Sequence, residues 1–315
     1  MDGATRFIYN GREEAAMMKK IFLSVLVFGG SALLFAQADA VGSGVVLKSV
    51  ENMHSAASET ADVVSQAVIG TPVKILKAER NAQGEEWFRI ETPDTYQGWM
   101  KGSSLRAYAP GEKAYGTSGQ TFEVTSLFAL VYAVDNVTKH KPLAMAPVGA
   151  LLEVGNWGER WCEITLPCGT KAWIQKGDGL VREPGFKRPR LSTEEMVTLA
   201  KRFLGLPYYW GGTSPLGFDC SGFVQLVYRL SGIQILRDAD IQFEKSGLAE
   251  VAPGFEDKGD LVFFGKAKGR ITHVGMMVNR EEFINATTHE KPVVQISKLK
   301  DPYWANIYRG ARRPI

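Results

Sequence analysis

The sequence predicts an α+β domain preceded by two small all-β barrels, and three observations support this fold class. Residues 45–176 contain short apolar runs separated by Gly, Pro, Asn and Asp, without a long helical period, which is typical of small barrels or sandwiches. This part of the chain also repeats internally. After residue 190, helical patterns come first and strand-like runs follow, an order that favours an α+β domain. The 315 residues accommodate two or three such domains.

The internal repeat indicates that the two β modules arose by duplication. Trp87-Phe88-Arg89-Ile90 recurs as Trp161-Cys162-Glu163-Ile164, and Gly98-Trp99-Met100 recurs as Ala172-Trp173-Ile174. Both offsets are 74 residues (161 − 87 and 173 − 99), and a constant offset is the signature of repeated modules. We therefore expect four segments along the chain. These are an export signal with an upstream extension (1–38), a first β module (42–108), a second β module (112–183) and the α+β domain (190–315).

The N-terminal segment has the pattern of a cleaved export signal. A basic start at Met17-Met18-Lys19-Lys20 precedes an apolar stretch, Ile21–Ala36, and Ala36-Gln37-Ala38 matches the small-x-small cleavage pattern. The apolar stretch is broken by two glycines and is shorter than the roughly 20 residues that a membrane span needs. The polar residues 1–16 precede this pattern, so we expect the chain to start at Met17 or Met18. The sequence predicts an exported, soluble protein, with the periplasm as the expected compartment.

Composition excludes several classes of protein. With 45% hydrophobic and 23% charged residues the chain is neither disordered nor collagen-like. The net charge is +3 without a long basic run, so we expect no nucleic-acid or anionic-membrane partner. A strand between Cys162 and Cys168 would hold them too far apart for a disulfide. No His, Cys or carboxylate cluster has metal-ligand spacing, so neither a metal nor a cofactor is expected. We expect a monomer.

Helix signals organise the α+β domain. Ser192 and Glu195 form a capping box at the start of the first helix, which ends before Gly205. A second helix begins near Cys220 and ends at Gly232. Two strand-like runs follow, Asp260–Phe264 and Thr272–Val278.

Cys220 is the candidate nucleophile. It lies between flanking glycines in Gly217–Gly222, where an extended segment becomes the second helix. A helix N-terminus presents free N–H groups and about half a positive charge, which we expect to lower the pKa of the thiol. Nearby glycines allow a substrate backbone to approach closely. The alternative is a buried cysteine with a structural role only.

A nucleophilic cysteine needs a base, and elimination selects His273. His54 and His140 lie in the β modules, and His289 lies in a polar stretch. His273 begins an apolar strand, Val274–Val278, which holds an imidazole rigidly. We therefore expect His273 to act as the general base.

Asn285 is the candidate group that orients His273. If the chain reverses around Asn279, the two residues fall opposite each other on paired strands with both side chains on one face. A register slip of one residue would separate them. The alternative for Asn285 is a polar residue at a turn or sheet edge.

Four motifs in this order resemble those of the NlpC/P60 cysteine peptidases. They are Tyr208–Pro215, Asp219–Phe223, Gly259–Phe264 and His273–Gly275, and the resemblance covers residues 192–315. It implies a papain-like α+β fold that cuts bonds in bacterial cell-wall peptides.

The two β modules resemble bacterial SH3-like domains. The first carries Asn52-Met53-His54-Ser55 and Gly98-Trp99 where that family has related stretches, and the second matches less well. Such modules bind cell-wall peptides or pack against a neighbouring domain.

The resemblance implies roles for individual residues. Cys220 corresponds to the nucleophile, His273 to the base, and Asn285 to the third polar residue, where many members have histidine. Asp219 corresponds to the carboxylate that receives the α-ammonium of the substrate, although an anion beside Cys220 opposes thiolate formation. Ser221 corresponds to a substrate-contacting serine, or else to an ordinary residue of the first helical turn.

Three further positions belong to the predicted site. Tyr208 corresponds to a tyrosine that lines the site and supplies an oxyanion donor, or it is a packing aromatic. Asp240 stands where we expect serine in the family, and a carboxylate facing the pocket would repel the α-carboxylate of D-glutamate. Tyr96 of the first β module is our candidate for the tyrosine that closes the pocket in related enzymes, or else it is a loop aromatic.

The combination of domains predicts an exported cysteine endopeptidase. It resembles the branch of the family that hydrolyses the γ-D-glutamyl–L-diamino acid bond of murein tripeptides and tetrapeptides with a free N-terminal L-Ala. Two alternatives remain open at this point. One is a peptidoglycan hydrolase that acts on stem peptides of the intact wall. The other is a non-catalytic wall-binding protein whose β modules carry the function.

Overall fold

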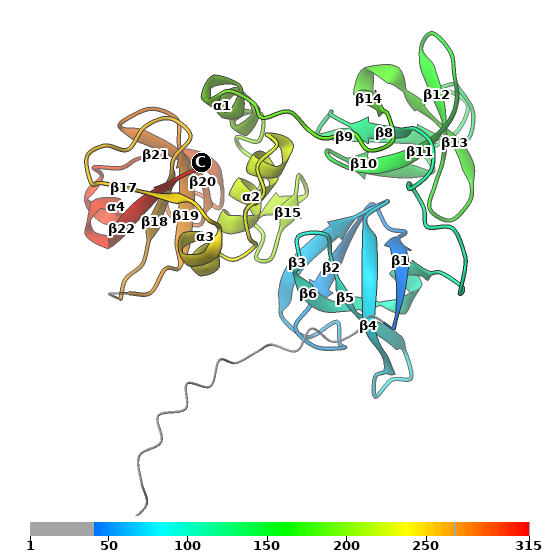
Figure 1. Ribbon diagram of the computed structural model, residues 1–315, viewed down its shortest axis with the longest axis horizontal. Coiled ribbons are helices and arrows are strands. Elements are labelled where there is room, and N and C mark those ends of the chain that lie inside the picture. Colours follow the sequence, from blue (N-terminus) through cyan, green and yellow to red (C-terminus); the bar gives the residue numbers. More distant parts are fainter. Residues whose placement is uncertain (1–40, 268, 315) are drawn as a thin grey trace, which may run out of the picture. The chain divides into compact units, whose positions relative to one another are not determined.

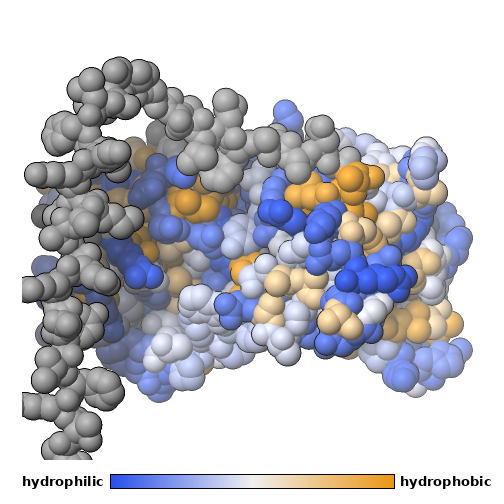
Figure 2. Space-filling view, turned by 90° about the horizontal axis from the view of Figure 1, so that it is seen from below, coloured by the Kyte–Doolittle hydropathy of each residue, from blue (hydrophilic) through white to orange (hydrophobic). Residues whose placement is uncertain are grey.

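The computed structural model describes residues 41–267 and 269–314 (Figure 1). The predicted export signal, residues 1–38, lies outside the described residues. Within the described ranges, no helix is long and apolar enough to cross a membrane. Hydrophobic residues on the visible face in Figure 2 are interspersed with hydrophilic ones.

The first β module is a seven-stranded sheet with the order β3-β2-β6-β5-β4-β1-β7. Alternate side chains of its strands point inward, and Met53, Ile90 and Met100 form the centre of its core. A short 3-10 helix, η1 (Gly102–Ser104), precedes the last strand. The strands are β1 (Gly42–Val46), β2 (Val50–His54), β3 (Val63–Val68), β4 (Pro72–Arg80), β5 (Glu86–Glu91), β6 (Gln97–Lys101) and β7 (Leu105–Ala107).

The second β module repeats this topology strand for strand. Its order is β10-β9-β13-β12-β11-β8-β14, which is the order of the first module with seven added to each number. The 3-10 helix recurs as η2 (Lys176–Asp178), so the repeated topology supports the duplication inferred from the 74-residue offset. The strands are β8 (Thr121–Val124), β9 (Phe128–Tyr132), β10 (Ala144–Pro147), β11 (Leu151–Trp157), β12 (Trp161–Thr165), β13 (Lys171–Gln175) and β14 (Gly179–Arg182).

All three cysteines are free, as predicted. Cys162 is buried within β12, whereas Cys168 is exposed in the turn that follows. The strand between them is the feature that keeps the two sulfur atoms apart.

The α+β domain is built on a six-stranded antiparallel sheet with the order β17-β22-β18-β19-β20-β21. In β18, Leu261 and Phe263 pack in the core beside α2, and Val262 and Phe264 pack on the opposite face around Trp304 of α4. Figure 1 shows α1 and α2 together on one side of this sheet. The elements are α1 (Thr193–Lys201), β15 (Thr213–Ser214), β16 (Gly217–Phe218), α2 (Cys220–Leu230), α3 (Ala239–Lys245), β17 (Ala249–Val251), β18 (Leu261–Phe264), β19 (His273–Met277), β20 (Glu282–Thr287), β21 (Val293–Lys298), α4 (Pro302–Ile307) and β22 (Tyr308–Arg313).

The predicted helix boundaries are confirmed by their caps. Ser192 accepts a hydrogen bond from the Glu195 N–H while the Glu195 carboxylate accepts from the Ser192 N–H, which is the predicted capping box. α2 ends at Leu230, just before Gly232, whose φ of 79° lies in the left-handed region. Both predicted strands of the domain form within one residue of the expected ends.

Two short helices were not predicted. The start of α4 could have been predicted from the sequence, because an N-cap aspartate followed by proline is a helix-start signal. Asp301 accepts from the Tyr303 N–H, and Pro302 occupies the first helical position. α3 has no side-chain cap at Asp238. Its buried Gln242 instead donates to the main-chain oxygens of Ser221, Leu236 and Arg237, so tertiary contacts fix this helix beside the start of α2.

Candidate active site

Cys220 is the first residue of α2, and its side chain is only 8% exposed. Burial, followed by the charge of the nearby Asp219 carboxylate, raises the pKa of the thiol to about 12. The backbone N–H groups of Val274 and Ser221 act in the opposite direction, which places the sulfur atom beside the start of β19. The expectation that the helix terminus lowers this pKa is wrong for this structure, because burial outweighs the helix dipole.

His273 and Asn285 are joined by a hydrogen bond of 2.9 Å between Nε2 and Oδ1. The Asn285 amide nitrogen donates to the Gln295 carbonyl and the Ser297 hydroxyl, which fixes Oδ1 as the atom that faces His273. An amide oxygen only accepts hydrogen bonds, so Nε2 carries the proton and Nδ1 is left as the basic nitrogen. The ring is therefore held in the tautomer that a general base requires.

The strand register places this pair diagonally. Met276 pairs with Ile284 and Met277 with Phe283, so Gly275 lies opposite Asn285 if the same register continues. The chain reverses one residue later than predicted, and the expectation that His273 and Asn285 lie directly opposite each other was wrong. They share a face as predicted, because the change in register is an even number of residues.

Gly275 provides the space for the diagonal contact. A Cβ atom there would lie 2.5 Å from the Phe283 ring and 3.1 Å from the Cβ of Asn285. Without that atom, the Asn285 side chain crosses the neighbouring strand and reaches His273. The imidazole also stacks on Trp304, with ring centroids 5.0 Å apart and planes at 26°.

The environment of His273 keeps the ring neutral. Burial lowers its pKa to about 4, against the opposing effects of the Asn285 hydrogen bond and the Asp219 carboxylate. The Cys220 sulfur lies against the N–H of Val274, the residue that follows His273. A neutral imidazole near a protonated thiol is suited to accept the thiol proton.

Asp219 is tied to Arg237 by a buried bidentate ion pair. The two guanidinium nitrogens approach its two carboxylate oxygens at 3.0 and 2.6 Å, and Arg237 is 2% exposed. Asp219 also caps α2 by accepting from the Gly222 N–H, and it accepts from the Gly211 N–H and the Ser221 hydroxyl. These five donors occupy the roughly four lone-pair positions of a carboxylate. Asp219 therefore has no position left for a substrate ammonium in this arrangement.

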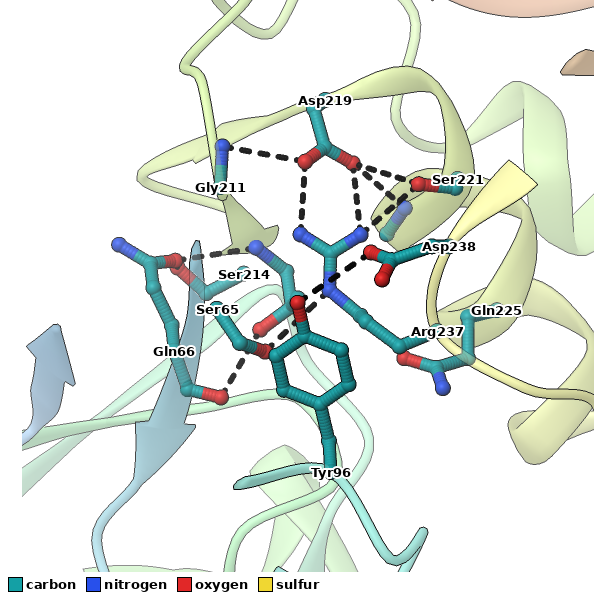
Figure 3. Close-up of polar contacts among 12 residues, drawn as sticks. Ser65, Gln66, Tyr96, Gly211, Ser214, Asp219, Ser221, Gln225, Arg237 and Asp238 are labelled. Atoms are coloured by element: carbon teal, nitrogen blue, oxygen red, sulfur yellow. Dashed lines mark hydrogen bonds and ion pairs between the residues drawn. The ribbon is translucent and has the colours of Figure 1, made fainter. Parts of the chain in front are cut away.

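Asp238 is the carboxylate with free capacity at this site. Within the described residues its side-chain hydrogen-bond partner is the Tyr96 hydroxyl, which donates to it over 3.4 Å, and its side chain is half-buried. Burial raises the pKa of Asp238, against the opposing charge of Arg237. Burial, followed by the charge of Asp238, raises the pKa of Tyr96 to about 12. Figure 3 shows Tyr96 and Asp238 facing each other beside Arg237.

The first β module contributes directly to this cluster. Ser65 of β3 accepts from Arg237 Nε at 3.2 Å. Gln66 accepts from the Thr213 N–H and the Ser214 hydroxyl, both at 3.0 Å (Figure 3). The first β module thus helps to position the Asp219–Arg237 ion pair and places Tyr96 against Asp238.

The remaining predicted residues are placed differently. Tyr208 is half-buried, and burial, with the nearby Cys220 and Asp219, raises its pKa. Ser221 is buried, and its hydroxyl accepts from Arg237 at 2.8 Å. Asp240 is exposed, and its carboxylate accepts from the N–H of its own neighbour Ile241, so the structure does not bring it into this cluster.

Sequence reasoning missed Arg237 and Asp238 as site residues. The available signal was an adjacent pair of opposite charges directly after the apolar Ile235-Leu236 and before α3. Trp304 was also missed, although its position on α4 is what stacks it on His273.

Comparisons with known proteins agree with this geometry. Residues 205–313 match the NlpC/P60 family, and residues 48–106 match the bacterial SH3 domain. The second β module has the same strand order, so its assignment as SH3-like stays a prediction supported by topology.

Two curated relatives are similar over most of the chain. A protein of Bacillus cereus (strain ATCC 10987 / NRS 248) named gamma-D-glutamyl-L-lysine dipeptidyl-peptidase is 32% identical over 79% of this chain and 74% of its own length. A protein of the same name from Bacillus subtilis (strain 168) is 38% identical over 74% of this chain and 76% of its own.

A solved structure is similar over most of the chain. The crystal structure of an NlpC/P60 family protein from Bacillus cereus ATCC 10987 superposes with a TM-score of 0.73 at 26% identity. The match covers 86% of this chain and 99% of that one. From the motifs, the fold and these likenesses together, the chain belongs to the NlpC/P60 family of cysteine peptidases.

Proposed function

We propose that this protein is an exported cysteine endopeptidase that hydrolyses the γ-D-glutamyl–L-diamino acid bond of murein peptides with a free N-terminal L-Ala. The observation that carries the proposal is the half-buried Asp238 carboxylate, which faces Tyr96 beside the Cys220 site. The names of the two curated relatives support the bond, and the export pattern of residues 17–38 supports action outside the cytoplasm, with the periplasm as the expected compartment.

The chemistry begins with proton transfer from Cys220 to Nδ1 of His273. The thiolate attacks the γ-carbonyl of D-glutamate, and the free N–H groups at the start of α2 stabilise the oxyanion with the Tyr208 hydroxyl as a further donor. Breaking the C–N bond then needs a proton on the leaving amine, which His273 returns from Nδ1. Water hydrolyses the thioester in the second half of the cycle and regenerates the thiol.

Recognition of the free amine follows from the charges of the cluster. A substrate ammonium near Asp238 compensates a carboxylate whose burial otherwise opposes its charged form. A blocked N-terminus would leave that carboxylate without an ion-pair partner of its own, because Arg237 is paired with Asp219, and this costs up to several kcal/mol. In this proposal Asp219 does not contact the substrate amine but positions Arg237 through their ion pair. Tyr96 of the first β module closes the pocket.

The test is a digest of two peptides by the purified protein, followed by mass spectrometry. One is L-Ala-γ-D-Glu-diaminopimelate with a free amine, and the other is its N-acetylated form. We expect cleavage of the free peptide only, with all activity lost in Cys220→Ala. Asp238→Asn is expected to reduce cleavage of the free peptide, whereas Asp240→Asn, two residues away and exposed, is the matched control that retains it.

The digest also separates the alternative functions. Equal cleavage of both peptides would contradict amine recognition and favour hydrolysis of the intact wall. Cleavage of neither by a folded protein would contradict the endopeptidase proposal and favour a wall-binding protein.

A further inference from the structure

A cavity of about 590 Å³ lies beside His273. Tyr208 and His273 both line it, so it reaches the proposed base. His289 and Tyr303 contribute a flat wall, because their rings stack with centroids 3.8 Å apart and planes at 7°. Such a wall suits the aliphatic part of an amino-acid side chain.

In the proposed reaction, this cavity lies on the leaving-group side of the scissile bond. His273 protonates the departing amine in the proposed reaction, so the released amino acid must lie against this ring. The residues that face the substrate amine, Tyr96 and Asp238, do not line the cavity, and neither does Asp219. Different residues therefore recognise the N-terminal amine and the leaving amino acid of a bound peptide.

The charges that line this cavity have one sign. Lys266 and Arg270 line it, and none of the described residues that line it is acidic. Both side chains are exposed, and within the described part of the chain neither makes a hydrogen bond or an ion pair. Their backbone is tied down, because Arg309 donates to the Lys266 carbonyl at 3.3 Å and the Arg270 N–H donates to Ala267 at 3.2 Å.

We infer that this cavity binds the released diamino acid and that Lys266 and Arg270 select a leaving group that carries a carboxylate. The inference rests on the proposed function. The ε-ammonium of lysine would meet two cations there, whereas the side chain of diaminopimelate ends in both an ammonium and a carboxylate. Diaminopimelate peptides are therefore preferred over lysine peptides. An α-carboxylate on a C-terminal diamino acid supplies the same chemistry from a second source.

The test compares kcat/KM for four tripeptides. L-Ala-γ-D-Glu is followed by diaminopimelate or by lysine, and each peptide has a free or an amidated α-carboxylate at the diamino acid. We expect diaminopimelate to be preferred by about fivefold, the upper range for one exposed ion pair. The preference should shrink as salt is raised, because exposed charges are screened.

The variant that tests the two cations is Lys266→Gln/Arg270→Gln. We expect it to cleave lysine and diaminopimelate peptides equally while the free-amine requirement is retained. Lys187→Gln/Lys201→Gln is the matched control, since it removes two exposed cations that do not line the cavity and should keep the preference.

The outcomes distinguish this inference from the proposed function. If the wild type cleaves both diamino acids equally, or if the double variant keeps the preference, the inference is overturned and the proposed function stands. If amidation of the α-carboxylate lowers kcat/KM while exchange of diaminopimelate for lysine has no effect, the cations bind the C-terminal carboxylate and the diaminopimelate preference is overturned. If no tripeptide is cleaved by any form, the proposed function itself fails.

Discussion

Asn285→Asp tests whether Asn285 sets the basicity of His273. The substitution nearly preserves shape and places a carboxylate 2.9 Å from Nε2. An opposite charge at such a distance stabilises the imidazolium and raises a histidine pKa by about 1–3 units. Starting from about 4, the pKa of His273 in the variant should reach about 5–7.

The sign of the effect on catalysis follows from the role of the base. A protonated imidazole cannot take the Cys220 proton, so activity is lost as the pH falls through the pKa of His273. The acid limb of kcat/KM should therefore lie near pH 4 in the wild type and move upward in the variant. The variant should also be less stable by about 1–3 kcal/mol, because a carboxylate oxygen would face the Gln295 carbonyl that the amide now donates to.

The assay is a pH series of kcat/KM from 3.5 to 8 for both proteins, with urea unfolding at pH 7. Asn279→Asp, in the turn before β20, is the control that adds the same charge away from the ring. An acid limb that does not move in Asn285→Asp, while the protein remains folded, would refute the assigned contact between Asn285 and His273.

Three further changes have defined outcomes. Arg237→Met should destabilise the α+β domain by about 3–5 kcal/mol in urea unfolding, because it leaves Asp219 buried without its ion pair. Adding Asp219→Asn should recover part of that loss. Strictly additive free-energy changes of the two substitutions would argue against the ion pair. Gly275→Ala should lower the free energy of unfolding by about 1–3 kcal/mol, because the added methyl group overlaps Phe283. It should also lower kcat about 100-fold by displacing Asn285. An unchanged kcat would contradict the diagonal contact between Asn285 and His273. Because the folded pKa of His273 is depressed, its contribution to stability is present above about pH 6.5 and is lost toward about pH 4. The difference in unfolding free energy between wild type and His273→Gln should therefore shrink by about 2–3 kcal/mol over this range in urea titrations. A constant difference would be inconsistent with a neutral buried ring.

Local signals predicted much of the fold. The capping box at Ser192, the glycine stop after α2 and the 74-residue repeat each depend on residues close in the chain or on a regular spacing. The shared face of His273 and Asn285 was also predictable, because it depends only on an even separation along paired strands. Their exact opposition was not, since one residue in the turn changes which residues pair.

Long-range contacts account for what the sequence did not reveal. Arg237 meets Asp219 across 18 positions, and Tyr96 meets Asp238 across 142. No periodicity connects such residues, and the proposed role of Tyr96 came from the family resemblance. The direction of the Cys220 pKa was wrong for the same reason, because burial is a property of the packed domain and not of a helix terminus alone.

The most direct test of the account is to identify the acylated residue. The purified protein is mixed with L-Ala-γ-D-Glu-diaminopimelate, quenched in acid within a turnover, and examined by intact mass and peptide mapping. The account predicts one L-Ala-γ-D-Glu acyl group on Cys220, absent from Cys220→Ala and from the N-acetylated peptide. An adduct on Cys162 or Cys168, or product release by Cys220→Ala, would contradict it.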